Sequence, residues 1–142
     1  MRSFLRKTPS FYKYLFWIWL ILMLSVSSYP KLPNPKIELG GTILRVDYIF
    51  HWLEYSVLLS LFVFWRTRIR QDFTWQIGWI ALILGVSLAT FDELHQLFIP
   101  GRSFNPIDML YNYLGVITGL FFSILLVKKI IQKPAEVSSS EP

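Results

Sequence analysis

Costly polar residues stand next to, or inside, segments of this chain that are apolar enough to enter a bilayer. An ionisable side chain at mid-membrane costs roughly 2.5–3.5 kcal/mol on insertion scales, and less toward the interface. A sequence that accepts this cost several times within one short region usually has a use for it. We therefore interpret the stretch from Asp92 to Gly119 as the centre of a functional site. Its polar members are Asp92, Glu93, His95, Gln96, Arg102, Asp108 and Asn112.

Helical spacing predicts that several of these residues meet others from an earlier segment. Residues three or four apart share one face of a helix, and three sets have this spacing. The sets are Asp47, His51 and Tyr55 (with Glu54 alongside), then Asp92 and Gln96, then Asp108 and Asn112. Glu93 flanks the second set. Because all three helix ends reach one depth, about one to two turns below the surface, we expect a shared polar pocket.

The charge balance of this pocket allows more than one kind of ligand. Acids outnumber the fixed cations: Asp47, Glu54, Asp92, Glu93 and Asp108 face only Arg45 and Arg102. In a low-dielectric site such an excess is relieved by protonation, by a protonated histidine or by a bound cation. Two helix N-termini also point at the pocket, and their dipoles favour an anion, for which Arg102 would be a forked donor. The sequence supports an anion clamp, a cation site, or both.

The same residues also have structural interpretations. Asp108 stands where the acid of a capping box belongs, in the sequence NPID that begins a helix. Asn112 can form a hydrogen bond between helices, and His51 can donate to Asp47 or to a backbone carbonyl. Gly115 and Gly119 form a small-xxx-small pair, which favours close helix packing over a role in ligand binding.

Four apolar segments would position these residues, at 14–28, 47–65, 75–98 and 105–129. Each is long enough to cross a bilayer once its flanks are included. Thr8 and Pro9 predict the start of the first helix, because threonine is a good N-cap and proline suits the first helical position. The predicted fold class is all-α, a four-helix transmembrane bundle over residues 1–133, followed by a disordered tail at 134–142.

The connections between the segments carry their own signals. Prolines and the Gly40-Gly41 pair predict an irregular outer loop after the first segment, and Arg66, Arg68 and Arg70 predict a basic turn after the second. A cleaved signal peptide is an alternative for the first segment, because Ser25 to Ser27 offer small residues to a peptidase.

Lysines and arginines are distributed unequally between the two sides. The N-terminal segment, the turn at 66–70 and the C-terminal flank hold ten, whereas the opposite loops hold four. The positive-inside rule then places both termini in the cytoplasm and turns the pocket outward.

Composition excludes several classes of protein. Cysteine is absent, which excludes disulfides, thiol catalysis and cysteine metal sites. The net charge of +5 is spread in short clusters without stacking aromatics between them, so no nucleic-acid partner is expected. No compact metal-ligand signature stands out, and we expect no resident metal or cofactor.

The ordered motifs resemble the VanZ-like family. They are D-x-x-x-H-x-x-x-Y at 47–55, DE-x-x-Q at 92–96, PGR at 100–102 and D-x-x-x-N-x-x-G-x-x-x-G at 108–119. The resemblance covers nearly the whole chain except the tail, and Glu54 is not part of the pattern. It implies a small multi-pass protein of the bacterial inner membrane, in a family whose founding member is associated with resistance to teicoplanin. No catalytic residue is carried over from this resemblance.

Two kinds of function are compatible with this pocket. The first is binding of a membrane lipid or lipid-linked envelope component through its headgroup. The alternative is a membrane-embedded hydrolase or transferase in which Asp92, Glu93 and His51 perform acid–base or metal chemistry. An ion pathway is disfavoured because the cytoplasmic half lacks a polar relay. A purely structural role would need only one or two of these polar groups. The ligand, the reaction if there is one, and the oligomeric state are left open.

Overall fold

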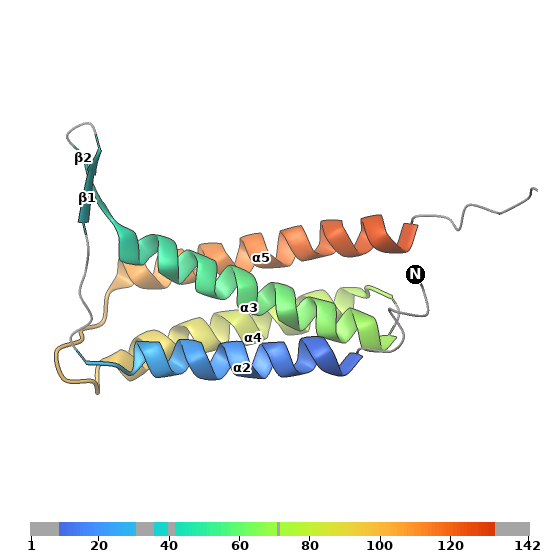
Figure 1. The fold of residues 1–142 in the computed structure, drawn as a ribbon, viewed down its shortest axis with the longest axis horizontal. Coiled ribbons are helices and arrows are strands. Elements are labelled where there is room, and N and C mark those ends of the chain that lie inside the picture. Colours follow the sequence, from blue (N-terminus) through green and yellow to red (C-terminus); the bar gives the residue numbers. More distant parts are fainter. Residues whose placement is uncertain (1–8, 31–35, 40–41, 71, 133–142) are drawn as a thin grey trace, which may run out of the picture.

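The chain forms a bundle of four helices with a small β-hairpin at one end (Figure 1). The structure, a computed structural model, describes residues 9–30, 36–39, 42–70 and 72–132. The helices are α2 (Pro9–Ser27), α3 (Val46–Arg70), α4 (Trp75–Gln96) and α5 (Pro106–Gln132). All four are long and apolar enough to cross a membrane, which confirms the predicted four-span architecture. Thr8 and the expected tail at 134–142 lie outside the described residues.

The helix boundaries follow local capping chemistry. The Thr74 side chain accepts a hydrogen bond from the Ile77 amide at 3.4 Å at the start of α4. The Asn105 side chain accepts one from the Ile107 amide at 3.0 Å, directly before α5. Side-chain acceptors at these positions satisfy amides that have no partner within the helix.

The basic segment after the second apolar run is helical, and its prediction as a turn was wrong. Helix α3 continues through Arg66 and Arg68 to end at Arg70. Arginine is a good helix former, and cations in the last turn interact favourably with the helix dipole.

The connection from α2 to α3 contains a hairpin that was predicted as an irregular loop. Strand β1 (Lys36–Leu39) pairs antiparallel with β2 (Thr42–Arg45), in a register that places Leu39 opposite Thr42. Two residues, Gly40 and Gly41, separate the strands in the sequence, and glycine pairs are typical of two-residue hairpin connections. The glycines that suggested irregularity are therefore better read as a hairpin signal.

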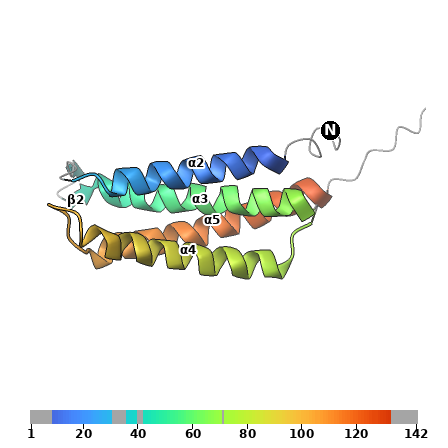
Figure 2. The same ribbon diagram turned by 90° about the horizontal axis from the view of Figure 1, so that it is seen from below.

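The helix ends that carry the candidate site residues lie together at one end of the bundle. The last residues of α2 and α4, the first residues of α3 and α5, and the hairpin all lie at this end, which we call the hairpin end (Figure 1). Helix α2 begins, and α5 finishes, at the opposite end (Figures 1 and 2).

Helices α3 and α5 approach each other closely because two glycines of α5 face the backbone of α3. A Cβ atom added at Gly115 would lie 2.4 Å from the carbonyl oxygen of Trp52, and one at Gly119 would lie 2.4 Å from that of Ser56. Neither backbone position leaves room for a methyl group. The Ser56 hydroxyl reinforces this contact from the α3 side, since it lies 2.9 Å from the Thr118 hydroxyl.

Helix α2 joins the same core. Its side chains Phe16, Leu20 and Met23 are buried, and the Trp19 indole donates to the Glu54 carbonyl at 3.0 Å. Large apolar side chains on the outside of all four helices stay exposed, as on a surface in contact with lipid.

Candidate functional site

Three helices bring acidic and amide side chains together at the hairpin end. Asp92 and Glu93 are both fully buried, although their positions on the helix differ by one residue. They contact different neighbours. Two groups result, which we call the His51 cluster (His51, Glu93, Asp108 and Asn112) and the Ser27 cluster (Ser27, Asp92 and Gln96).

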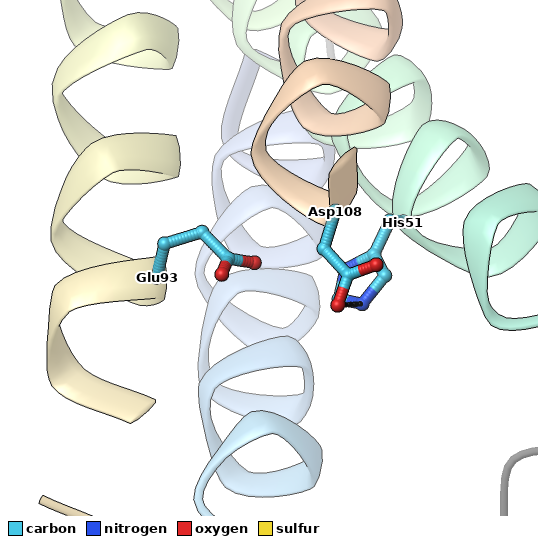
Figure 3. A group of neighbouring side chains, drawn as sticks. All are labelled: His51, Glu93 and Asp108. Atoms are coloured by element: carbon cyan, nitrogen blue, oxygen red, sulfur yellow. Dashed lines mark ion pairs between the residues drawn. The ribbon is translucent and has the colours of Figure 1, made fainter. Parts of the chain in front are cut away.

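The His51 cluster joins α3, α4 and α5 (Figure 3). His51 Nε2 lies 3.8 Å from Asp108 Oδ2, and the Glu93 carboxylate points toward this pair from α4. One donor atom each from His51, Glu93 and Asp108 lies within 4.8 Å of the other two. Asn112 Nδ2 donates to Glu93 Oε1 at 3.5 Å. These groups lie within about two turns of the helix ends.

The capping-box bond expected for Asp108 is not formed. The Asn105 amide, which such a bond would use, donates instead to Glu93 Oε2 at 3.4 Å. Glu93 reaches this amide from α4, and Asp108 faces His51 while it is hydrogen-bonded to the Asn105 side chain. A tertiary contact has replaced the backbone bond of the capping box.

The Ser27 cluster ties α4 to the end of α2. Gln96 Nε2 donates to the Ser27 hydroxyl at 3.2 Å, and that hydroxyl is hydrogen-bonded to Asp92. In the sequence, Ser27 stands out only as part of a possible cleavage site. The signal for its place in this cluster is a serine at the end of an apolar segment, facing acids on another helix.

Asp47 lies at the edge of this region and forms a salt bridge with Arg45. Arg45 donates to both of its carboxylate oxygens, and this hydrogen bonding raises the pKa of Arg45 above its ordinary value. The guanidinium also lies 4.6 Å from the ring centroid of Tyr48, which stacks on Tyr111 at 4.9 Å. The negative charge of Asp47 is thus already compensated.

Arg102 and Tyr55 differ from the expected arrangement in their contacts. The Arg102 guanidinium donates to the carbonyls of Tyr29 and Val26 at 3.3 and 3.4 Å, so it contacts the end of α2. Both bonds are long, and other N–H groups of the fork are not engaged by them. Tyr55 is fully buried, and its hydroxyl has no hydrogen-bond partner within the described ranges.

Several buried polar atoms at this end of the bundle have no hydrogen-bond partner among the described residues. They are His51 Nδ1, Tyr55 OH, Asp92 Oδ1, His95 Nδ1, Asp108 Oδ1 and Asn112 Oδ1. In native proteins most buried polar atoms are paired, because each one left unpaired costs about 1–3 kcal/mol. The region therefore has an unusual number of free donors and acceptors for a set of purely structural contacts.

The arrangement can support two kinds of chemistry. An imidazole beside a carboxylate can accept and release a proton. Nitrogen and oxygen donors that converge from three helices can also hold a cation or hydrogen-bond a polar headgroup.

These observations define a class: a multi-pass membrane protein with a polar site buried at one end of a four-helix bundle. The family model described as VanZ/LLP1 matches residues 10–127, and the chain belongs to this family. No curated protein matches the chain. No solved structure matches it either.

Proposed function

We propose that this protein binds the anionic headgroup of a membrane lipid or lipid-linked envelope component at the hairpin end of the bundle. One observation carries the proposal. At this end of the bundle, His51 Nδ1 and the Tyr55 hydroxyl are buried, can each donate a hydrogen bond, and have no partner within the described residues. Donors of this kind are expected where an anionic ligand completes the site.

Two further features favour an anionic headgroup. Helices α3 and α5 both begin at the hairpin end, and a helix N-terminus favours negative charge. Arg102 lies at the same end and would add a cation. We infer the source of the headgroup from membership in the VanZ/LLP1 family. The founding member of the VanZ-like family is associated with resistance to teicoplanin, which suggests a component of the cell envelope.

The protein would lie in the bacterial inner membrane with both termini in the cytoplasm and the site facing outward. The excess of lysine and arginine near the termini and at 66–70 supports this orientation. The start of α2 and the end of α5 lie at one end of the bundle, as that orientation requires (Figure 1).

Lipid binding in nanodiscs tests the proposal. The full chain would be titrated with a bacterial polyprenyl phosphate, and bound lipid would be counted by native mass spectrometry. Tyr55→Phe removes the hydroxyl at nearly constant volume, and it should weaken binding by roughly tenfold or more, because a hydrogen bond to a charged group contributes about 1.5–3 kcal/mol.

Asp72→Asn is the control, since Asp72 is exposed beside the α3–α4 connection at the opposite end. Equal binding by wild type and Tyr55→Phe would overturn the proposal. In a susceptible bacterium, wild-type expression should also raise the teicoplanin concentration needed for inhibition, and Tyr55→Phe should not.

A second candidate function is a membrane-embedded hydrolase or transferase. The separation of 3.8 Å between His51 Nε2 and Asp108 Oδ2 favours it, because a carboxylate beside an imidazole can orient a general base. Wild-type protein incubated with lipid-linked diphosphates should then release phosphate, and His51→Gln should abolish the release. Intact substrates after prolonged incubation with the wild type would eliminate this candidate.

A further inference from the structure

We propose that His51, Glu93, Asp108 and Asn112 form a binding site for a divalent transition-metal cation, either Zn²⁺ or Mn²⁺. The inference uses the same cluster as the proposed headgroup site and rests on that cluster being functional. The cation can nevertheless be measured without any lipid, so failure of one proposal is distinguishable from failure of the other.

The geometry of three side chains is close to that of a metal site. One ligand atom each from His51, Glu93 and Asp108 lies within 4.8 Å of the other two, and the pair His51 Nε2 and Asp108 Oδ2 is 3.8 Å apart. Ligands bound tetrahedrally at about 2.0–2.2 Å from Zn²⁺ are roughly 3.4 Å apart, so closure needs movements on the order of 1 Å. Side chains from three separate helices converge in this way (Figure 3).

A fourth residue supplies an independent sign that something binds here. Asn112 is fully buried, and its Nδ2 donates to Glu93 Oε1 at 3.5 Å, while its Oδ1 has no partner in the part of the chain that the structure describes. Asp108 Oδ1 is also buried without a partner among those residues. Both are oxygen acceptors, and a cation would satisfy both of them, whereas an anion would satisfy neither.

The charges of the cluster agree with this assignment. Within the part of the chain that the structure describes, no lysine or arginine forms a salt bridge with Glu93 or Asp108. Two carboxylates brought together in a low-dielectric site repel each other, and a divalent cation would compensate both charges.

The ligand types narrow the choice of metal. The cluster offers one imidazole nitrogen, carboxylate oxygens and an amide oxygen, and the chain has no cysteine. Imidazole suits Zn²⁺, Cu²⁺, Fe²⁺ and Ni²⁺, whereas carboxylates and carbonyls also suit Mn²⁺. The side chains of His51 and Asp108 are 12% and 10% exposed, so neither is completely enclosed by the protein.

A bound cation would also explain how an acidic cluster could receive an anionic headgroup. Its outer coordination positions would be available to phosphate oxygens, beside the N-termini of α3 and α5. The class of headgroup implied is therefore a phosphate or diphosphate, held through the metal rather than against the carboxylates.

Metal binding by the full chain in detergent tests the inference. Protein stripped with a chelator and exchanged into lipid-free detergent would be dialysed against Zn²⁺ or against Mn²⁺, and bound metal would be counted by elemental mass spectrometry. We expect about one ion per chain for the wild type and at least a tenfold higher Kd for His51→Gln.

His95→Gln is the matched control, because it removes the only other histidine, whose ring stacks on Phe91 outside the cluster. It should bind like the wild type. If His51→Gln does not fold, Cu²⁺ loaded into the wild type and into His95→Gln decides the question, since nitrogen hyperfine coupling from one imidazole should persist in both. Absence of bound metal in the wild type, or equal loss in the two histidine variants, would overturn the inference.

Discussion

Asp92 and Glu93 are neighbours in the sequence and both are buried, yet they contact different helices. Asp92 is hydrogen-bonded to Ser27 of α2, whereas Glu93 accepts bonds from the Asn105 amide and from Asn112 near and on α5. Successive residues of a helix point about 100° apart. The Asp92 side chain therefore faces the end of α2, whereas the Glu93 side chain faces the first turns of α5. Asp92 thus belongs to a contact between α4 and α2, whereas Glu93 belongs to the candidate ion site.

This separation predicts different outcomes for two isosteric substitutions. Glu93→Gln should weaken Zn²⁺ or Mn²⁺ binding by at least about tenfold, because it removes an anionic oxygen ligand. Asp92→Asn should leave the Kd for the ion within about twofold, because it keeps the oxygen that can accept from Ser27. Dialysis and metal counting on both variants checks this. Equal losses would show that the two acids act as one site.

The residue before α5 also has a measurable role. The Asn105 side chain caps α5, so Asn105→Ala should lower the free energy of unfolding by about 1 kcal/mol, and Asn105→Ser should restore most of it. Thermal unfolding in detergent provides the comparison, with Ser103→Ala at an exposed neighbouring position as the control. A destabilisation by Asn105→Ser as large as that by Asn105→Ala would contradict the capping role.

At the scale of elements, the contact of α3 with α5 fixes where His51 and Asp108 meet. Gly115 and Gly119 place the α5 backbone directly against Trp52 and Ser56 of α3. The pair His51 and Asp108 lies further toward the hairpin end of the same contact, because His51 precedes Trp52 on α3 and Asp108 precedes Gly115 on α5. A wider separation of these helices would move the imidazole away from the carboxylate, so packing and site are physically coupled.

Gly119→Ala should therefore destabilise the bundle and disturb the site. Its Cβ would lie 2.4 Å from the Ser56 carbonyl oxygen, and overpacking of this kind costs about 1–3 kcal/mol. Gly78→Ala is the matched control on α4, because its nearest new contact is a side-chain atom of Phe73 at 3.4 Å. Unfolding midpoints of the two variants, measured in one detergent, should differ clearly. Equal midpoints would argue against a tight α3–α5 contact.

At the scale of the whole molecule, the site can face outward only if the hairpin end does. The chain has no cysteine, so single substitutions can be labelled without a background. A membrane-impermeant maleimide should label Glu38→Cys, in the exposed part of β1, in intact cells. It should label Asp72→Cys, beside the α3–α4 connection, only after the membrane is permeabilised. The reverse pattern would contradict both the orientation and the outward-facing site.

Much of this architecture can be predicted from the sequence. The four apolar runs, the break before Trp75 and the start of α5 at Pro106 follow from residue types alone, because insertion energies and caps act locally. The helical register of α3 placed His51 and Tyr55 on the inner side. The extension of α3 through Arg70 and the hairpin after α2 were misjudged, because basic residues and glycine pairs each fit two local structures.

The sequence by itself determined that the stretch from Asp92 to Gly119 is a polar region in a membrane protein, because the cost of burying charge is a property of each residue. Only the tertiary structure decided how those residues divide. Glu93 accepts from the Asn105 amide, and Asp108 faces His51. Asp92 is hydrogen-bonded to Ser27, and Arg102 contacts the end of α2. The physical reason is that hydrogen-bond partners depend on how neighbouring helices are packed and rotated. Spacing along one helix leaves that choice open.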